Sequence, residues 1–132
     1  MVTPPDIKPV FWIGGTKEDL SALHEDVRDA VGQALFEAQK GGKHAKAKAL
    51  SGYGDASVLE VVVDHAGDTF RAVYTVRWPD CVYVVHVFQK KSKSGIKTPK
   101  ADLDLIEARM KRITKARDEA AKTKRKKGAK DE

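Results

Sequence analysis

The sequence predicts an α+β fold, in which a small antiparallel sheet is packed against helices. Three apolar segments, at 58–64, 69–78 and 82–90, follow one another with only short turns between them. Strands in such tight succession form an antiparallel meander. Apolar residues recur at helical spacing before the meander, at 16–40, and again after Thr98. Because helices must bury their apolar stripes against the sheet, we expect two N-terminal helices on one face, and a C-terminal helix.

The N-terminal part begins with a short strand candidate at 10–13, which two glycines close. The helical pattern that follows is expected to break near His24 into a short helix and a longer one. A second pair of glycines, Gly41 and Gly42, ends the longer helix.

Period-two alternation predicts which side chains of the meander share a face. The side chains expected to point to the core are Leu59, Val61, Val63, Val85 and Val87. Those expected on the other face, which we predict to be partly open, are Glu60, Arg71, His86, Phe88 and Lys90. A carboxylate, two cations, an imidazole and an aromatic ring on one surface are typical of a site that handles phosphate.

The final helix is expected to start at Thr98, since Pro99 suits the first helical position. Its apolar stripe fades after Ile113, and the chain then becomes charged and low in complexity. We therefore predict a folded domain at 1–116 and a basic, disordered tail at 117–132. Such a tail adds affinity for RNA through counterion release without setting specificity.

Composition limits the class of protein. A chain of 132 residues, 41% of them hydrophobic, is enough for one small domain. The single cysteine, Cys81, excludes an internal disulfide and a zinc cluster built on cysteines. No apolar run could span a membrane and no secretory signal is seen, so we expect a cytoplasmic protein without a membrane partner.

The net charge of +6 is unevenly distributed, because residues 111–132 hold 10 Lys/Arg and 4 Asp/Glu and so account for all of it. Within the balanced remainder, two lysine-rich stretches, at 40–48 and 90–100, contain no acidic residue. The second stretch directly follows the most apolar strand, so it forms a basic loop at the rim of the sheet. Such loops can hold a polyanion, although a solvated loop is the simpler reading.

Several segments together resemble a known family. They are Lys8 to Trp12, Ala47 to Gly52, Leu59-Glu60-Val61, Phe70 to Tyr74, His86 to Ser92, and Lys97-Thr98-Pro99 with Asp102 and Arg109 behind it. This combination resembles the RelE/ParE superfamily of type II toxin–antitoxin toxins, and within it the phage-derived HigB-like branch. The resemblance implies a RelE-like fold and a toxin that cuts mRNA in the ribosomal A site without a metal or cofactor. It also implies a helix-turn-helix antitoxin as partner.

The resemblance carries over to individual residues. It implies catalytic roles for Arg71, which would clamp phosphate, and for His86, Lys90, Lys91 and Glu60. The RNA-binding candidates are Lys43, Lys46, Lys48, Arg77, Lys93 and Lys97. Many relatives carry a second arginine two residues after the glutamate, where this chain has Val62.

Simpler readings stay open beside these roles. Glu60 and Arg71 can form a purely structural cross-strand ion pair, and a lone strand histidine such as His86 is more often structural than catalytic. At the level of function, the alternatives to a metal-independent endoribonuclease are a ParE-like gyrase poison and an inactive phage remnant that only binds antitoxin or nucleic acid.

Overall fold

The structure, a computed structural model, describes residues 7–90 and 98–130. Five strands and three helices follow one another along the chain. They are β1 (Val10–Trp12), α1 (Thr16–Ser21), α2 (Glu25–Gln39), β2 (Ala47–Ala49), β3 (Val58–His65), β4 (Asp68–Thr75), β5 (Val82–Lys90) and α3 (Lys100–Lys130). Within the described residues, the helices are too short or too polar for any of them to cross a membrane.

The five strands form one sheet in the order β1-β5-β4-β3-β2. The meander is antiparallel, but β1 runs parallel to β5, so the sheet is mixed and the prediction of a purely antiparallel sheet is wrong. A parallel neighbour is possible here because the chain leaves β1 through two helices, whereas a hairpin would force the antiparallel direction. The sequence also missed β2, which has only three residues and an exposed lysine at its centre.

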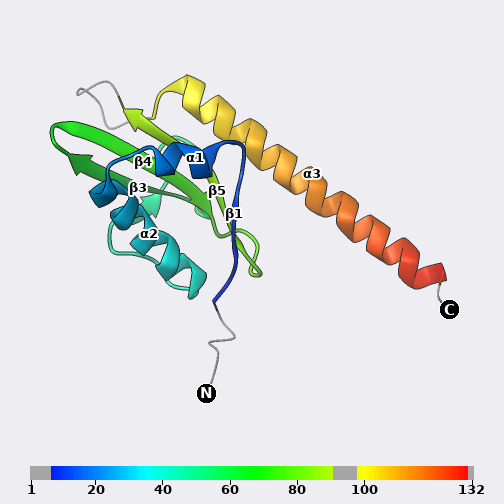
Figure 1. Cartoon of the computed structure of the whole chain (residues 1–132). Helices are drawn as coiled ribbons and strands as arrows, with labels where there is room; N and C mark the ends of the chain where they lie inside the picture. Colours follow the sequence, from blue (N-terminus) through cyan, green and yellow to red (C-terminus); the bar gives the residue numbers. More distant parts are fainter. Residues whose placement is uncertain (1–6, 91–97, 131–132) are drawn as a thin grey trace, which may run out of the picture.

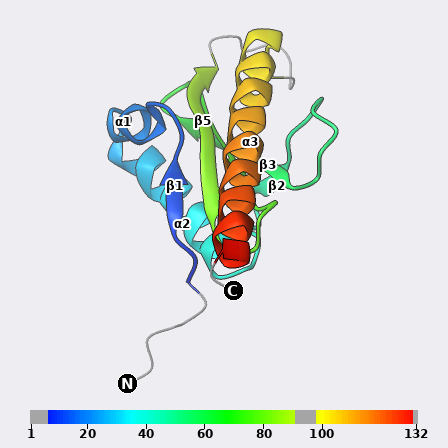
Figure 2. The ribbon, with the colours of Figure 1, turned by 90° about the vertical axis from the view of Figure 1, so that its right-hand side faces the viewer.

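Helices cover both faces of the sheet: α1 and α2 lie on one face, and α3 lies across the other (Figures 1 and 2). The face that we expected to be open is therefore covered. The reason is that the α3 stripe of Ile106, Met110 and Ile113 is buried and needs an apolar surface to pack on. It finds one in Val58 and Val73, among others.

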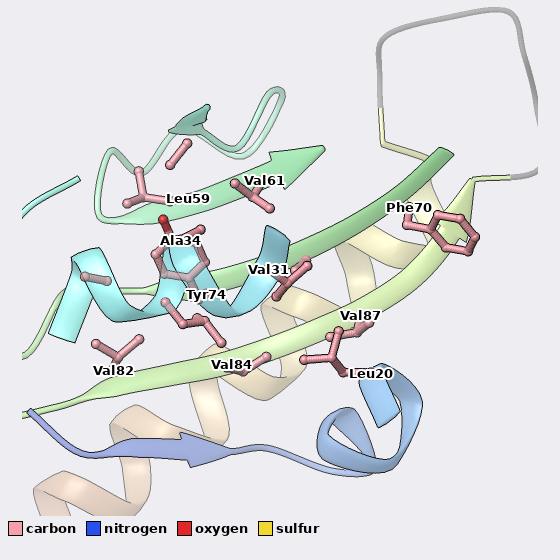
Figure 3. Close-up of a cluster of buried hydrophobic side chains, with 14 of the residues drawn as sticks. Leu20, Val31, Ala34, Leu59, Val61, Phe70, Tyr74, Val82, Val84 and Val87 are labelled. Atoms are coloured by element: carbon pink, nitrogen blue, oxygen red, sulfur yellow. The ribbon is translucent and has the colours of Figure 1, made fainter. Parts of the chain in front are cut away.

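The core between the sheet and the N-terminal helices is almost wholly apolar (Figure 3). Val31 and Ala34 of α2 point into it, toward Leu59 and Val61 of β3 and Tyr74 of β4. Burial raises the pKa of Tyr74 to about 12, so its hydroxyl stays protonated.

A β-bulge in β5 reorders the predicted alternation. Val73 is opposite His86 but the next residue, Tyr74, is opposite Val84, so Val85 is an extra residue in its strand. The bulge turns Val85 toward α3, where it joins the cluster around Ile106, and our placement of Val85 in the other core is wrong. Strict alternation cannot anticipate an inserted residue.

The long helix α3 continues to Lys130, although the sequence predicts disorder after residue 116. The part of the helix after residue 116 is rich in Ala, Lys and Arg, which are good helix formers. Arg117 also fixes this part to the body, because its Nη2 donates to both carboxylate oxygens of Asp80, at 3.0 and 3.1 Å, and its Nη1 donates to the Tyr83 hydroxyl at 3.0 Å. The hydrogen bond from Arg117 lowers the pKa of Asp80.

Candidate functional site

A buried ion pair lies on the α3 side of the sheet, near the start of that helix. Arg71 of β4 donates through Nη1 to Glu60 Oε2 of β3 at 2.9 Å. Their side chains are 4% and 0% exposed. The two residues are diagonal neighbours, because Glu60 is opposite Val73 and Arg71 is opposite Val62. The expectation that Arg71 is partly exposed is wrong, since α3 covers it.

The ion pair is connected to the surface and to α3. Arg71 Nη1 also donates to Thr98 Oγ1, just before α3, at 3.3 Å. On the other side, Lys48 Nζ lies 3.8 Å from Glu60 Oε1, and the lysine side chain is 54% exposed. Lys48 is in register with Glu60, which places both side chains on the same face. The side chains of Lys48, Glu60, Arg71 and Thr98 thus form a series of polar contacts that leads from solvent into the interior.

An imidazole–carboxylate pair lies beside this series of polar contacts. His86 follows the bulge in β5, and its Nε2 is 2.8 Å from Oδ1 of Asp102 in the first turn of α3. The ring also stacks on Phe88, with centroids 4.5 Å apart. Its other nitrogen, Nδ1, is buried and has no hydrogen-bond partner among the described residues. An oriented imidazole with one nitrogen left over is the arrangement that proton transfer needs.

The exposed cations gather near this cluster on the β2 side. Lys43 and Lys46 precede or enter β2 and are exposed, like Lys48. A cavity of about 440 Å³ opens beside them, and its lining residues are Lys46, Lys48, Val62, Val63 and Asp64. A cavity with two lysines at its edge can accommodate a phosphate or sugar of an extended strand.

The remaining candidates fall in different places. Lys90 ends β5, half-buried and in register with Thr69. Lys91, Lys93 and Lys97 lie outside the described residues. Arg77 follows the other end of β4, six residues or about 20 Å of strand beyond Arg71. It is paired with Asp55 and lies over the ring of Trp78, so the structure does not bring it to the cluster.

Two members of the cluster had no role in the sequence prediction. Thr98 was named as the helix start, and both Thr98 and Asp102 were named among the residues that carry the family resemblance, but neither was given a site role. An acidic residue in the first turn of a helix is favourable for the helix alone, which hides any second role. Their positions in the sequence could have indicated a second role. Helix α3 follows β5 and packs back onto it, so its first turn lies near the end of β5 that carries His86.

Taken together, the fold and the cluster define a small α+β protein with a polar site under the start of its C-terminal helix. Residues 18–111 match the family described as phage-derived protein Gp49-like (DUF891). The match covers more than half of the chain, so the protein belongs to this family, which is a family of toxin–antitoxin toxins of the RelE/HigB type. Membership implies an antitoxin partner. No curated protein matches the sequence.

Proposed function

We propose that this protein is the toxin of a type II module, that it acts as a ribosome-dependent, metal-independent mRNA endoribonuclease, and that it belongs to the HigB-like branch. The observation that carries the proposal is the convergence of Lys48, Glu60, Arg71, His86 and Asp102 on one end of an otherwise apolar face, in a chain of a toxin family. The partner would be a helix-turn-helix antitoxin, and the site of action the cytoplasm.

The reaction is attack of a ribose 2′-hydroxyl on the adjacent phosphate, which forms a 2′,3′-cyclic phosphate and breaks the bond from phosphorus to the 5′-oxygen of the next nucleotide. The 2′-hydroxyl loses a proton, and the departing 5′-oxygen gains one. His86 would take part in proton transfer, because Asp102 orients the ring through Nε2 while Nδ1, although buried, has no hydrogen-bond partner among the described residues. Lys48, together with Lys90 and Lys91, would neutralise the charge that develops on the phosphate. Lys43, Lys46, Lys93 and Lys97 would hold the RNA backbone.

Arg71 takes a different role from the one implied by the resemblance. Its guanidinium already binds Glu60 and Thr98 and is almost inaccessible. We therefore assign phosphate contact to Lys48 and Lys90, whose side chains reach solvent, and give Arg71 the role of holding Glu60 and the start of α3.

The ribosome would supply the alignment of the message. The enclosed position of His86 leaves little room for the protein to align free RNA by itself, and alignment accounts for a large part of such rate enhancements. Purified protein should then leave naked RNA intact and cut message on programmed ribosomes. Fast cleavage of naked RNA by nuclease-free protein would contradict this dependence.

The central experiment is expression of the chain alone, with growth and mRNA 5′ ends as readouts. The wild type should arrest growth and produce new 5′ ends. His86→Gln should lower cleavage by about 10²–10⁴-fold, the usual contribution of a general acid or base. Asp102→Asn should lower it less, and the matched control His44→Gln should leave it unchanged. Full cleavage by the His86 variant would remove the histidine from the mechanism.

The burial of Glu60 and Arg71 also favours a second candidate, a non-enzymatic toxin such as a ParE-like gyrase poison. A binding module needs no accessible catalytic arginine. Growth arrest with intact messages and induced DNA damage would select this candidate. Normal growth at well-detected protein levels would instead indicate an inactive phage remnant.

A further inference from the structure

Two histidines and an aspartate meet on the α2 side of the sheet, at the end that carries the β3–β4 turn. His24 is the residue immediately before α2, Asp26 is in the first turn of α2, and His65 is the last residue of β3. The start of α2 and the turn between β3 and β4 lie at the same end of the molecule (Figure 1). The meeting is invisible in the sequence, because about 40 residues separate the two histidines.

The three side chains offer ligand atoms at short separation. One ring nitrogen of each histidine and one carboxylate oxygen of Asp26 all lie within 4.8 Å of one another. Nδ1 of His24 and Nδ1 of His65 are each 3.8 Å from Asp26 Oδ2. The two rings are stacked, with centroids 4.1 Å apart and planes at 26°.

These separations are close to those of a metal centre. Zinc–nitrogen bonds of 2.0–2.1 Å in a tetrahedral site put ligand atoms about 3.3 Å apart. The side chains of His24 and Asp26 are 56% and 71% exposed, and that of His65 is 29% exposed. The contraction of about 0.5–1.5 Å that a metal ion requires therefore needs only side-chain rotation at the surface and no movement of packed atoms.

The backbone holds the cluster together from both sides. His24 Nδ1, the nitrogen that lies 3.8 Å from Asp26 Oδ2, accepts a hydrogen bond from the Asp26 backbone N–H at 3.0 Å, which caps α2 and holds the ring beside the carboxylate. His65 enters a tight turn in which Ala66 and Gly67 have φ values of 53° and 85°. The turn residue Asp68 is in register with His65, so the histidine is fixed at the end of a paired ladder.

We propose that His24, Asp26 and His65 form a binding site for a divalent transition metal ion, with zinc as the best match to two imidazoles and a carboxylate. The donor set leaves a fourth position for water. The ion would tie the start of α2 to the β3–β4 turn, and it would stabilise the folded state because the unfolded chain does not hold the three ligands together. It takes no part in the RNA chemistry.

The test is titration of the full chain with Zn²⁺ at neutral pH, by calorimetry and by thermal unfolding. The wild type should bind one equivalent and unfold at a higher temperature, and a chelator should reverse the shift. His65→Gln should weaken binding by at least about 10–100-fold, the loss that removal of even an outer hydrogen-bond partner causes. His24→Asn should do the same while it keeps the cap of α2, since asparagine is a good N-cap residue.

Two controls separate this site from other histidines of the chain. His44→Gln, at a half-buried position before β2, and His86→Gln, in the α3 cluster, should keep the zinc affinity and the thermal shift. If the wild type takes up no zinc, or if His65→Gln and His24→Asn bind it as tightly as the wild type, the site does not exist. Loss of binding in the His86 variant alone would place the ion elsewhere and overturn the proposal as well.

Discussion

The two faces of the sheet are built from the same five strands but differ in what they bury. The face under α1 and α2 buries aliphatic side chains with Phe70 and Tyr74, whereas the face under α3 buries Glu60, Arg71 and His86 next to its aliphatic cluster. Buried charge is expensive unless it is paired. The polar groups of the α3 face are accordingly paired, Glu60 with Arg71 and His86 with Asp102.

The difference indicates that the polar cluster of the α3 face is retained for a reason other than the stability of the fold. Well-packed apolar residues at the positions of Glu60 and Arg71 would stabilise the fold at least as well as the ion pair does. The polar cluster is also confined to the end of the face where α3 starts, and the apolar cluster around Ile106 occupies the rest. One end of α3 thus covers a candidate site while its middle anchors the helix.

The largest expected effect comes from breaking the buried pair. Arg71→Met leaves Glu60 buried with, among the described residues, only the more distant Lys48 paired to it, and should lower the free energy of unfolding by about 3–5 kcal/mol. Adding Glu60→Leu removes the orphaned charge and should recover most of this loss. Urea denaturation of the single and double variants measures both. A single variant within 1 kcal/mol of the wild type would show that the pair is not buried as described.

The two apolar clusters provide the next comparison. Leu35→Ala on the α2 side and Ile106→Ala on the α3 side should each cost about 2–5 kcal/mol, because both side chains are buried and leave a cavity. Only Ile106→Ala should also speed amide hydrogen exchange in α3 relative to the sheet, since Ile106 anchors that helix. Equal loss of protection in α2 and α3 for both variants would mean that the two faces unfold as one unit.

The smallest effect concerns acid stability at the edge of the fold. Asp55 accepts hydrogen bonds from the hydroxyl and the backbone N–H of Ser57, at 2.7 and 2.9 Å, and these, with Arg77, lower its pKa below 3.8. Its contribution is therefore present above pH 3.8 and is lost as the pH falls through the lowered pKa.

Thermal unfolding of Asp55→Asn against the wild type tests this sign. At neutral pH the variant should be less stable by no more than about 1 kcal/mol, as for other partly exposed pairs. The gap should close as the pH falls below 3.8. If the difference in stability between the variant and the wild type widens in acid, another carboxylate dominates the acid dependence of stability.

The sequence alone determined much of the architecture. It predicted the α+β class, the meander and the C-terminal helix, because apolar periodicity and turn residues are local signals. It also named Glu60, Arg71 and His86 as neighbours on one face, since alternation along paired strands fixes the face of each residue.

Only the tertiary structure decided what covers that face and what the residues touch. The packing of α3 onto the sheet turned an expected open surface into a closed one and supplied Thr98 and Asp102 as partners. The parallel pairing of β1 with β5, the bulge at Val85 and the approach of His65 to His24 also depend on contacts between distant segments. Local sequence patterns depend on the spacing of residues along the chain. These contacts depend on how helices and strands pack against one another, and the spacing of residues does not determine that packing.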